Sequence, residues 1–410
     1  MLLNKAESLI SAIIAKIGNT TKSRQKFIYH LLNLFMGLRG RYNFMNMARY
    51  GGYNEKTYRN QMEQPFDWAR FNTELILAKC SGELIMAYDP SWLAKSGKKT
   101  PHIGRFWSGT AQAVKRGIEI GSLAVVDVVN KTAFSLEAIQ TPVIPKGLAH
   151  DENSIDHHVS VILNRTEQAQ KLNIKYLAVD GYFAKEKFVS GIINNSPLHI
   201  ISKFRQDANL RYAYKRPKRT GKGRPKLYAG KVDTNFIDRR RIRYCFDIDE
   251  HTSVFSGIVY SISLKRKVRI VYLEQYDQDG YAKGHSILFS TDLTLSPEKI
   301  LLYYKQRFQI EFLFRDAKNF AGLEHCQARS ENKINFHVNA SLTTVSLAKA
   351  LHYLPIPKHQ RESFSMLDIK TLYFNQYITD LIFSKLALDM SCEKIRRLYD
   401  ECLSIGRLVA

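Results

Sequence analysis

Residues 304–318 read YKQRFQIEFLFRDAK, and the spacing of their polar and apolar side chains predicts one long amphipathic helix. Ser296 is a typical N-cap, and Pro297 suits the first turn of a helix. Gly322 is a typical stop. We therefore expect a single helix from residue 296 to about residue 319.

One face of this predicted helix carries a hydroxyl, three cations and a carboxylate: Tyr304, Arg307, Glu311, Arg315 and Lys318. At roughly 100° per residue, these positions fall within about 80° of arc. The other side is apolar and suits a protein core: Leu302, Ile310, Leu313, Ala317 and Phe320. The polar face is either a solvated surface with weak ion pairs between neighbouring turns, or a surface that holds a charged ligand.

The charge of the chain indicates the kind of ligand. Its 61 Lys and Arg against 38 Asp and Glu give a net charge of +23, which predicts a polyanionic partner, nucleic acid first. A membrane surface is the alternative, but no apolar run approaches the roughly 18 residues of a membrane span. The N-terminal residues do not resemble a signal peptide, and the five cysteines form no C-x-x-C pair. We expect a cytoplasmic protein without a membrane partner, a zinc site or disulfides.

Residues 1–78 carry apolar side chains at helical spacing, which predicts a helical segment. Within it, a short helix over 43–50, the glycine pair 51–52 and a polar helix over 54–61 are typical of a helix-turn-helix. Asn54 would cap the second helix. Its remaining polar side chains would then face DNA: Lys56, Tyr58, Arg59 and Asn60. An αα-hairpin without DNA contacts is the alternative interpretation.

From about residue 79 the periodicity changes to that of strands alternating with helices, which predicts a mixed α/β sheet. The expected strands cover 84–88, 118–129, 133–139, 176–179 and 198–202, with a hairpin turn at 130–131. The expected helices cover 154–172 and 184–193. Two of these strands end in an aspartate, namely Asp89 and Asp180.

Residues 204–226 are basic and rich in Gly and Pro, which predicts a loop without a packed core. Its cations are candidates for DNA contact: Arg205, Lys218, Arg219 and Arg224. Alternating segments over 239–249, 254–264, 268–276 and 287–289 then read as strands. We interpret residues 205–285 as a β-rich insertion into the α/β domain, and expect helices again after Gly322 with a break near 355–357.

The chemistry of phosphodiester cleavage gives the two aspartates a possible function. Two divalent ions about 3.5–4 Å apart can activate the attacking water and stabilise the leaving oxygen. Mg²⁺ and Mn²⁺ prefer oxygen ligands and keep several waters, so two or three carboxylates suffice. Asp89, Asp180 and Glu311 would form such a set. Each aspartate taken alone is also a common turn or capping residue.

With these residues in place, the chain resembles the DDE transposases of the bacterial insertion-sequence-4 class. The similarity rests on Asp89 in Y-D-P-S, Asp180 in V-D-G-Y-F, and the full Tyr304, Arg307, Glu311, Lys318 signature, over roughly residues 80–345. It implies a ribonuclease-H-like catalytic fold with a β-rich insertion. It also implies that the three carboxylates bind Mg²⁺, or Mn²⁺ in its place, while Tyr304, Arg307 and Lys318 hold the DNA strand.

The resulting prediction has four parts: a helical DNA-binding segment (1–78), a catalytic domain (79–204 and 286–345), a basic insertion (205–285) and a helical C-terminal region (346–410). The enzyme would cleave the ends of an insertion sequence and transfer the 3′-hydroxyl into target DNA. Its partners would be double-stranded DNA, as terminal inverted repeats and target, and a second copy of the chain. The alternatives are a catalytically silent repressor and a metal-dependent nuclease.

Overall fold

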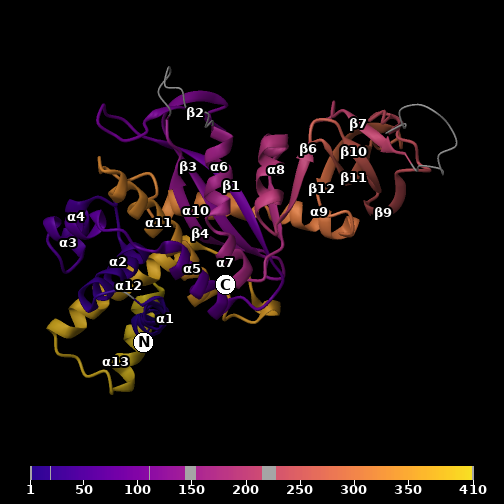
Figure 1. Ribbon diagram of the computed structural model, residues 1–410. Coiled ribbons are helices and arrows are strands. Elements are labelled where there is room, and N and C mark those ends of the chain that lie inside the picture. The colour runs from indigo at the N-terminus through magenta and orange to yellow at the C-terminus, as the bar shows by residue number, and fades with distance from the viewer. Residues whose placement is uncertain (1, 19, 110, 144–153, 215–227, 409–410) are drawn as a thin grey trace. The chain divides into compact units, whose positions relative to one another are not determined.

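The computed structural model describes residues 2–18, 20–109, 111–143, 154–214 and 228–408, which form a mixed α/β protein (Figure 1). The chain forms two compact units. The first comprises Met1–Gly82, Pro90–Val143 and Gln309–Ala410, and the second comprises Glu83–Asp89 and Ile144–Phe308. These units are defined by packing, so the division of the chain into four functional segments stays a prediction.

The second unit contains a mixed sheet. Its strands are the start of β1 (Leu84–Ala94), β5 (Tyr176–Val179), β6 (His199–Phe204), β7 (Leu210–Ala213), β8 (Tyr228–Lys231), β9 (Arg243–Asp249), β10 (Thr252–Ser261), β11 (Arg266–Tyr276) and β12 (Ala282–Ser290). The order is β1-β5-β6-β12-β11-β10-β7-β8, with β9 beside β10. β1, β5 and β6 run parallel, and the later neighbours are antiparallel. The predicted strands of the insertion are confirmed, whereas β7 and β8 were missed.

The helices of this unit are α6 (Ser154–Leu163), α7 (Thr166–Lys171), the 3₁₀ turn η1 (Gly181–Phe183), α8 (Glu186–Asn195) and α9 (Pro297–Gln306). The prediction of one helix over 154–172 is wrong, because the chain turns between α6 and α7. There the Thr166 hydroxyl donates to the Leu163 carbonyl at 2.8 Å. This carbonyl would accept a backbone N–H in a continuous helix, so the side chain competes with the helical ladder.

The prediction of one helix over 296–319 is also wrong. The Arg307 N–H still bonds the Tyr303 carbonyl, but the Phe308 N–H bonds the Lys305 carbonyl, a 3₁₀ pattern that closes α9. A separate helix, α10 (Gln309–Phe320), begins next and belongs to the first unit. No Gly or Pro marks this break in the sequence.

Leu302 was expected in the core, yet it is 37% exposed. Tyr303 takes the inward position instead, because its ring packs 5.2 Å from that of Tyr176 and its hydroxyl bonds Glu83. Adjacent helix positions differ by about 100°, so burying Tyr303 turns Leu302 outward. On α10, the predicted apolar positions Ile310, Leu313 and Ala317 are buried, whereas Phe320 is only half-buried.

The first unit holds an antiparallel group of three strands: β2 (Gly104–Ser108), β3 (Ala113–Asp127) and β4 (Thr132–Gln140). The predicted hairpin between β3 and β4 is confirmed. Its turn places Lys131 in the left-handed region with φ 49°, and the Asp127 carboxylate accepts the Asn130 N–H at 2.9 Å. Such side-chain bonds are why Asp and Asn favour turns.

The helices of the first unit are α1 (Leu2–Ile17), α2 (Lys22–Gly37), α3 (Phe44–Tyr50), α4 (Glu55–Glu63), α5 (Trp68–Lys79), α10, α11 (Glu331–Ala348), the π-helical turn η2 (Lys349–Tyr353), the 3₁₀ turn η3 (Lys358–Gln360), α12 (Met366–Lys385) and α13 (Glu393–Ser404). The helices predicted at both ends of the chain are therefore present. None of those that the structure describes is long and apolar enough to span a membrane.

Two distant parts of the chain meet where α2 lies beside α12 (Figure 1). The Tyr42 hydroxyl donates toward the Phe320 carbonyl at 2.7 Å, and the Lys370 ammonium donates to both oxygens at 3.0 Å. Burial lowers the pKa of Lys370 to about 8. Gly322 follows with φ +70°, and a Cβ there would lie 2.2 Å from the Tyr42 ring. This close approach explains why a glycine ends α10.

A buried histidine on α11 gives the unit a pH-dependent stability. The His337 side chain is buried and its Nε2 lies 2.7 Å from the Gly322 carbonyl, and burial lowers its pKa to about 4. The folded state therefore resists protonation of His337. The contribution of this residue to the free energy of unfolding is fully present above pH 6.5, and it is lost as the pH falls to 4. The shift corresponds to at most about 3 kcal/mol.

We expect His337→Gln, which keeps an N–H donor, to flatten the loss of stability between pH 6.5 and 4. Urea unfolding at a series of pH values measures this slope. His158 and His352 have similarly lowered pKa values, so the variant removes only part of the wild-type slope. An unchanged slope in the variant contradicts the assignment.

Candidate active site

Two aspartates lie at the ends of neighbouring strands in the second unit. β1 and β5 pair in parallel with Tyr88 opposite Val179, so Asp89 and Asp180 are the next residues of the two strands. Both are partly exposed. Parallel pairing brings the carboxyl ends of strands to the same sheet edge, where ligands of α/β sheets commonly bind.

The backbone around each aspartate differs. Asp180 ends β5 and caps η1, with its Oδ1 accepting the Tyr182 N–H at 2.7 Å. The Ser202 hydroxyl of β6 donates to the Asp180 carbonyl at 2.8 Å, which ties this residue to the neighbouring strand. Asp89 was expected to end its strand, but β1 continues through Pro90 to Ala94. Proline lacks only the N–H donor there and tolerates an extended backbone.

A buried aromatic cluster supports both strand ends. The Tyr88 hydroxyl lies 2.7 Å from Nδ1 of His158 on α6, and both side chains are buried. Phe183 packs edge-on against Tyr88 at 5.6 Å and against His158 at 5.4 Å. Burial lowers the pKa of His158 to about 4, so this imidazole is neutral at pH 7. Because Tyr88 precedes Asp89 and Phe183 follows Asp180 by three residues, one cluster restrains both strand ends.

The other residues of the polar face divide between the two units. Tyr304 and Arg307 belong to the second unit, where the buried Arg307 guanidinium lies 5.8 Å from the centre of the Tyr304 ring. Glu311, Arg315 and Lys318 lie on α10 in the first unit. The predicted face is therefore divided between α9 with its C-cap residue Arg307 and the separate helix α10.

Within α10, the two cations have protein partners. Arg315 pairs with the buried Asp316 at 2.9 Å. Lys318 donates to the Trp92 carbonyl at 3.2 Å and lies 3.6 Å from the Glu324 carboxylate. Glu311 is partly buried in the first turn, near the positive end of the helix dipole. These contacts hold Lys318 beside the segment that follows Asp89 in sequence.

The donor atoms of the site determine whether it suits a metal ion. Across the described parts of the chain, no three His, Cys, Asp or Glu side chains form a metal-binding group. The Asp89 and Asp180 carboxylates nevertheless suit a hard divalent cation, because Mg²⁺ is commonly held by one or two carboxylates with water completing its shell. These two carboxylates therefore fit a divalent cation, whereas Glu311 does not join them in a three-residue group among the described side chains.

The predicted helix-turn-helix corresponds to α3 and α4. Lys56 is exposed, as DNA contact requires. Arg59 is exposed too, but its Nε donates to Glu55 at 2.9 Å and its guanidinium lies over the Phe44 ring. The expectation that Tyr58 faces DNA is wrong. Tyr58 is fully buried and bonds His30, because it occupies the inward face of α4.

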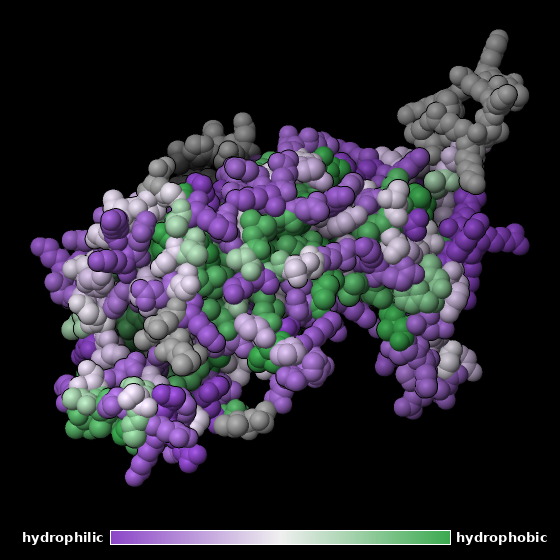
Figure 2. All heavy atoms as spheres, turned by 90° about the horizontal axis from the view of Figure 1, so that it is seen from below, coloured by the Kyte–Doolittle hydropathy of each residue, from purple (hydrophilic) through white to green (hydrophobic). Residues whose placement is uncertain are grey.

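The basic segment after β6 is only partly described. Arg205 has an 86% exposed side chain and lies 3.3 Å from Asp207. Lys218, Arg219 and Arg224 lie outside the described residues. Figure 2 shows that hydrophilic side chains cover much of the face drawn, with hydrophobic patches between them.

An open groove of about 540 Å³ borders Gly181, the residue after Asp180, and contains a lysine that sequence reasoning missed. It is lined by Gly181, Lys203, Phe204, Arg205, Gln206 and Asp207. Lys203 sits near the end of β6, the strand next to β5. Its place on a strand after the second aspartate was a usable signal. Tyr88 and His158 had no such signal, because nothing in the sequence pairs them.

Comparison with known proteins adds an independent finding. The family model described as a transposase DDE domain matches residues 143–347, half of the chain. This range includes Asp180 and Glu311 and begins after Asp89. No curated protein matches the chain significantly.

The contact between Tyr88 and His158 is testable by stability alone. We expect Tyr88→Phe and His158→Phe each to lower the free energy of unfolding by about 1–3 kcal/mol, since each removes the buried hydrogen bond between the two side chains. The loss of unfolding free energy in the double variant should be clearly smaller than the sum of the two single losses, because both changes remove the same hydrogen bond. Urea unfolding measures all three.

Tyr182→Phe is the matched control, because Tyr182 adjoins the cluster but is 48% exposed. We expect it to change stability by less than about 0.5 kcal/mol. Additive losses in the double variant would show that the two side chains act independently.

Proposed function

The chain belongs to the transposase DDE-domain family, and on that premise we propose that it is a DNA transposase of the insertion-sequence-4 class. It would cut DNA at the ends of a bacterial insertion sequence and join the freed 3′-hydroxyl to target DNA. The observation that carries this proposal is the parallel register of β1 and β5, which makes Asp89 and Asp180 neighbours at one sheet edge. The catalytic domain would have a ribonuclease-H-like fold.

Asp89, Asp180 and Glu311 would hold two Mg²⁺ ions, with Mn²⁺ as a possible substitute. When bound, the ions supply Lewis-acid stabilisation of the attacking and leaving oxygens of the phosphodiester. Asp180 offers a carboxylate whose orientation is supported by the Tyr182 N–H. Glu311 would complete the set, and this needs its helix to approach the two strand ends.

The cations of the signature would hold the DNA. Lys318 would act as a point charge toward a phosphate, and Arg307 as a bidentate donor. Tyr304 would stack on a base or bond a phosphate. Arg315, Arg205, Lys218, Arg219 and Arg224 would add phosphate contacts, with Lys56 and Arg59 contributing from α4. Because Arg307 is 6% exposed, its contact with DNA requires local rearrangement around Tyr304 and Phe308.

The partners would be the terminal inverted repeats, the target DNA and a second copy of the chain. Two ends must be joined to one target, which favours a homodimer on DNA. The place of action would be the bacterial cytoplasm, at the nucleoid. The net charge of +23 supports a polyanionic substrate.

We expect wild-type protein to nick a plasmid carrying the gene's own flanking DNA in Mg²⁺ or Mn²⁺. Asp89→Asn, Asp180→Asn and Glu311→Gln should each abolish the nicks, because each removes a charged oxygen ligand. EDTA should do the same. Mapping of the cut positions on a sequencing gel is the measurement.

Asp207→Asn is the control, because Asp207 is also an exposed aspartate, lines the groove that Gly181 borders, and lies outside the proposed set. Its nicking should match wild type. Binding without any cut would favour the silent repressor. Cuts without joining of a pre-cut 3′-end to a second duplex would favour a nuclease.

DNA affinity should also depend strongly on salt. With roughly 6–10 phosphate contacts, we expect the binding constant to fall by about 10³–10⁵ between 50 and 200 mM salt, because each contact releases counterions. Fluorescence anisotropy with a labelled duplex measures this slope. A flat salt dependence would contradict an electrostatic DNA interface.

A further inference from the structure

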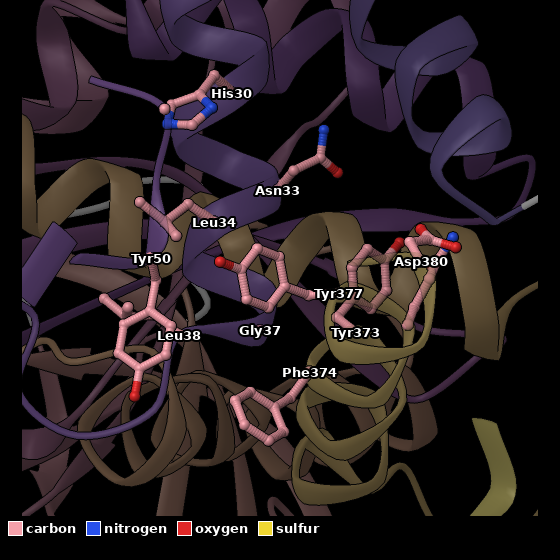
Figure 3. A pocket seen from close by; sticks show the side chains of 12 residues that line it. His30, Asn33, Leu34, Gly37, Leu38, Tyr50, Tyr373, Phe374, Tyr377 and Asp380 are labelled. Atoms are coloured by element: carbon pink, nitrogen blue, oxygen red, sulfur yellow. The ribbon is translucent and has the colours of Figure 1, made fainter. Parts of the chain in front are cut away.

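A cavity of about 300 Å³ opens between α2 and α12 in the first unit (Figure 3). Four aromatic side chains contribute to its wall: Tyr50, Tyr373, Phe374 and Tyr377. Tyr50 and Tyr377 stand edge to face with ring centres 6.3 Å apart. Its size lies at the lower end of small-molecule sites, which are typically concave and mostly apolar.

Two amide oxygens in this wall are buried without a hydrogen-bond donor, namely Asn33 Oδ1 and Gln376 Oε1. A flip that exchanges the oxygen and the nitrogen of either amide would not satisfy these groups. The Asn33 NH₂ donates to the Tyr29 carbonyl at 3.1 Å, and the Gln376 side chain hydrogen-bonds the Tyr399 hydroxyl. Both amides are thus held with the oxygen unsatisfied. Buried polar atoms of this kind require a partner such as water or a ligand.

Among the lining residues, the only charged side chain is a carboxylate, and from outside that set the Arg39 guanidinium lies over the Phe374 ring, 4.8 Å from its centre. Asp380 is the one carboxylate among the lining residues, and it accepts the Tyr399 hydroxyl at 2.6 Å. His30 also lines the cavity, and burial lowers its pKa, which keeps the imidazole neutral. No Lys or Arg is among the lining residues. Aromatic faces carry a negative potential as well, so the polar and aromatic groups together favour positive charge and N–H donors.

We propose that this cavity binds an organic cation with several N–H donors, a primary ammonium or a guanidinium group. The aromatic rings attract the charge, as they do in other sites for organic cations. Asp380 supplies the counter-charge, and the oxygens of Asn33 and Gln376 accept the N–H groups. This activity is independent of cleavage chemistry.

The cation has two possible sources, a free amine or a Lys or Arg side chain of a second copy. In either case it would contact α2 and α12 together and stabilise their packing. Gly37 brings the two helices close, since a Cβ there would lie 3.1 Å from the Tyr373 backbone. Bound cation should therefore raise the thermal stability of the whole chain.

Benzamidine and benzamide form a matched pair of probes, because they share a flat shape and differ in charge. We expect the full chain to bind benzamidine with one-to-one stoichiometry in isothermal titration calorimetry at 0.15 M salt, and benzamide at least about tenfold more weakly. Asp380→Asn should weaken benzamidine binding about tenfold and leave benzamide binding nearly unchanged. A tenfold change corresponds to about 1.4 kcal/mol.

Asp400→Asn is the control, because it removes the same charge from an exposed position on α13. Tyr377→Ala is the second variant, since Tyr377 is 42% exposed and its loss should weaken binding without unfolding the chain. Equal binding of the two probes, equal effects of Asp380→Asn and Asp400→Asn, or no saturable binding to folded protein would each overturn the proposal.

Two further measurements separate the sources of the cation. Spermidine binding to a chain that sediments as a monomer would identify a free amine. Self-association that benzamidine competes away, and that Tyr377→Ala abolishes, would identify a side chain of a second copy.

Discussion

The parallel pairing of β1 with β5 is the constraint on which the proposed chemistry depends. Backbone hydrogen bonds set the register of Tyr88 opposite Val179, and this register alone makes the two aspartates neighbours. A shift by one residue would turn the following side chain to the opposite face of the sheet. The buried cluster of Tyr88, His158 and Phe183 resists such a shift, because a hydrogen bond and edge-on ring contacts join the three side chains.

Much of this arrangement could be predicted from local patterns. The apolar run 176–179 predicts β5, and the turn residues between β3 and β4 predict their hairpin. The strands of the insertion also appear where alternating Val, Ile and Tyr predicted them. These elements are dictated by short-range periodicity, which a single sequence displays directly. The family match supports the transposase interpretation of the chain, over a range that includes Asp180 and Glu311, whose roles stay a proposal.

Other features depend on tertiary contacts that no local pattern contains. The break after Arg307 occurs without Gly or Pro, and the inward turn of Tyr303 depends on Glu83 and Tyr176. Tyr58 looked like a DNA contact because it lies in a polar helix, yet its partner His30 lies on another helix. For Tyr303 and Tyr58, a side chain from another element takes part in burying one face of the helix.

The contact of Lys370 with Tyr42 has a consequence for how the protein is made. These residues are 328 positions apart, and α2 packs along α12. At roughly 5–20 residues per second, synthesis of the intervening chain takes about 16–66 s. During that interval the N-terminal helices lack the surface that buries them, so they complete their packing only after most of the polypeptide has left the ribosome. Packing of α2 against α12 is therefore completed well after α2 itself has been synthesised.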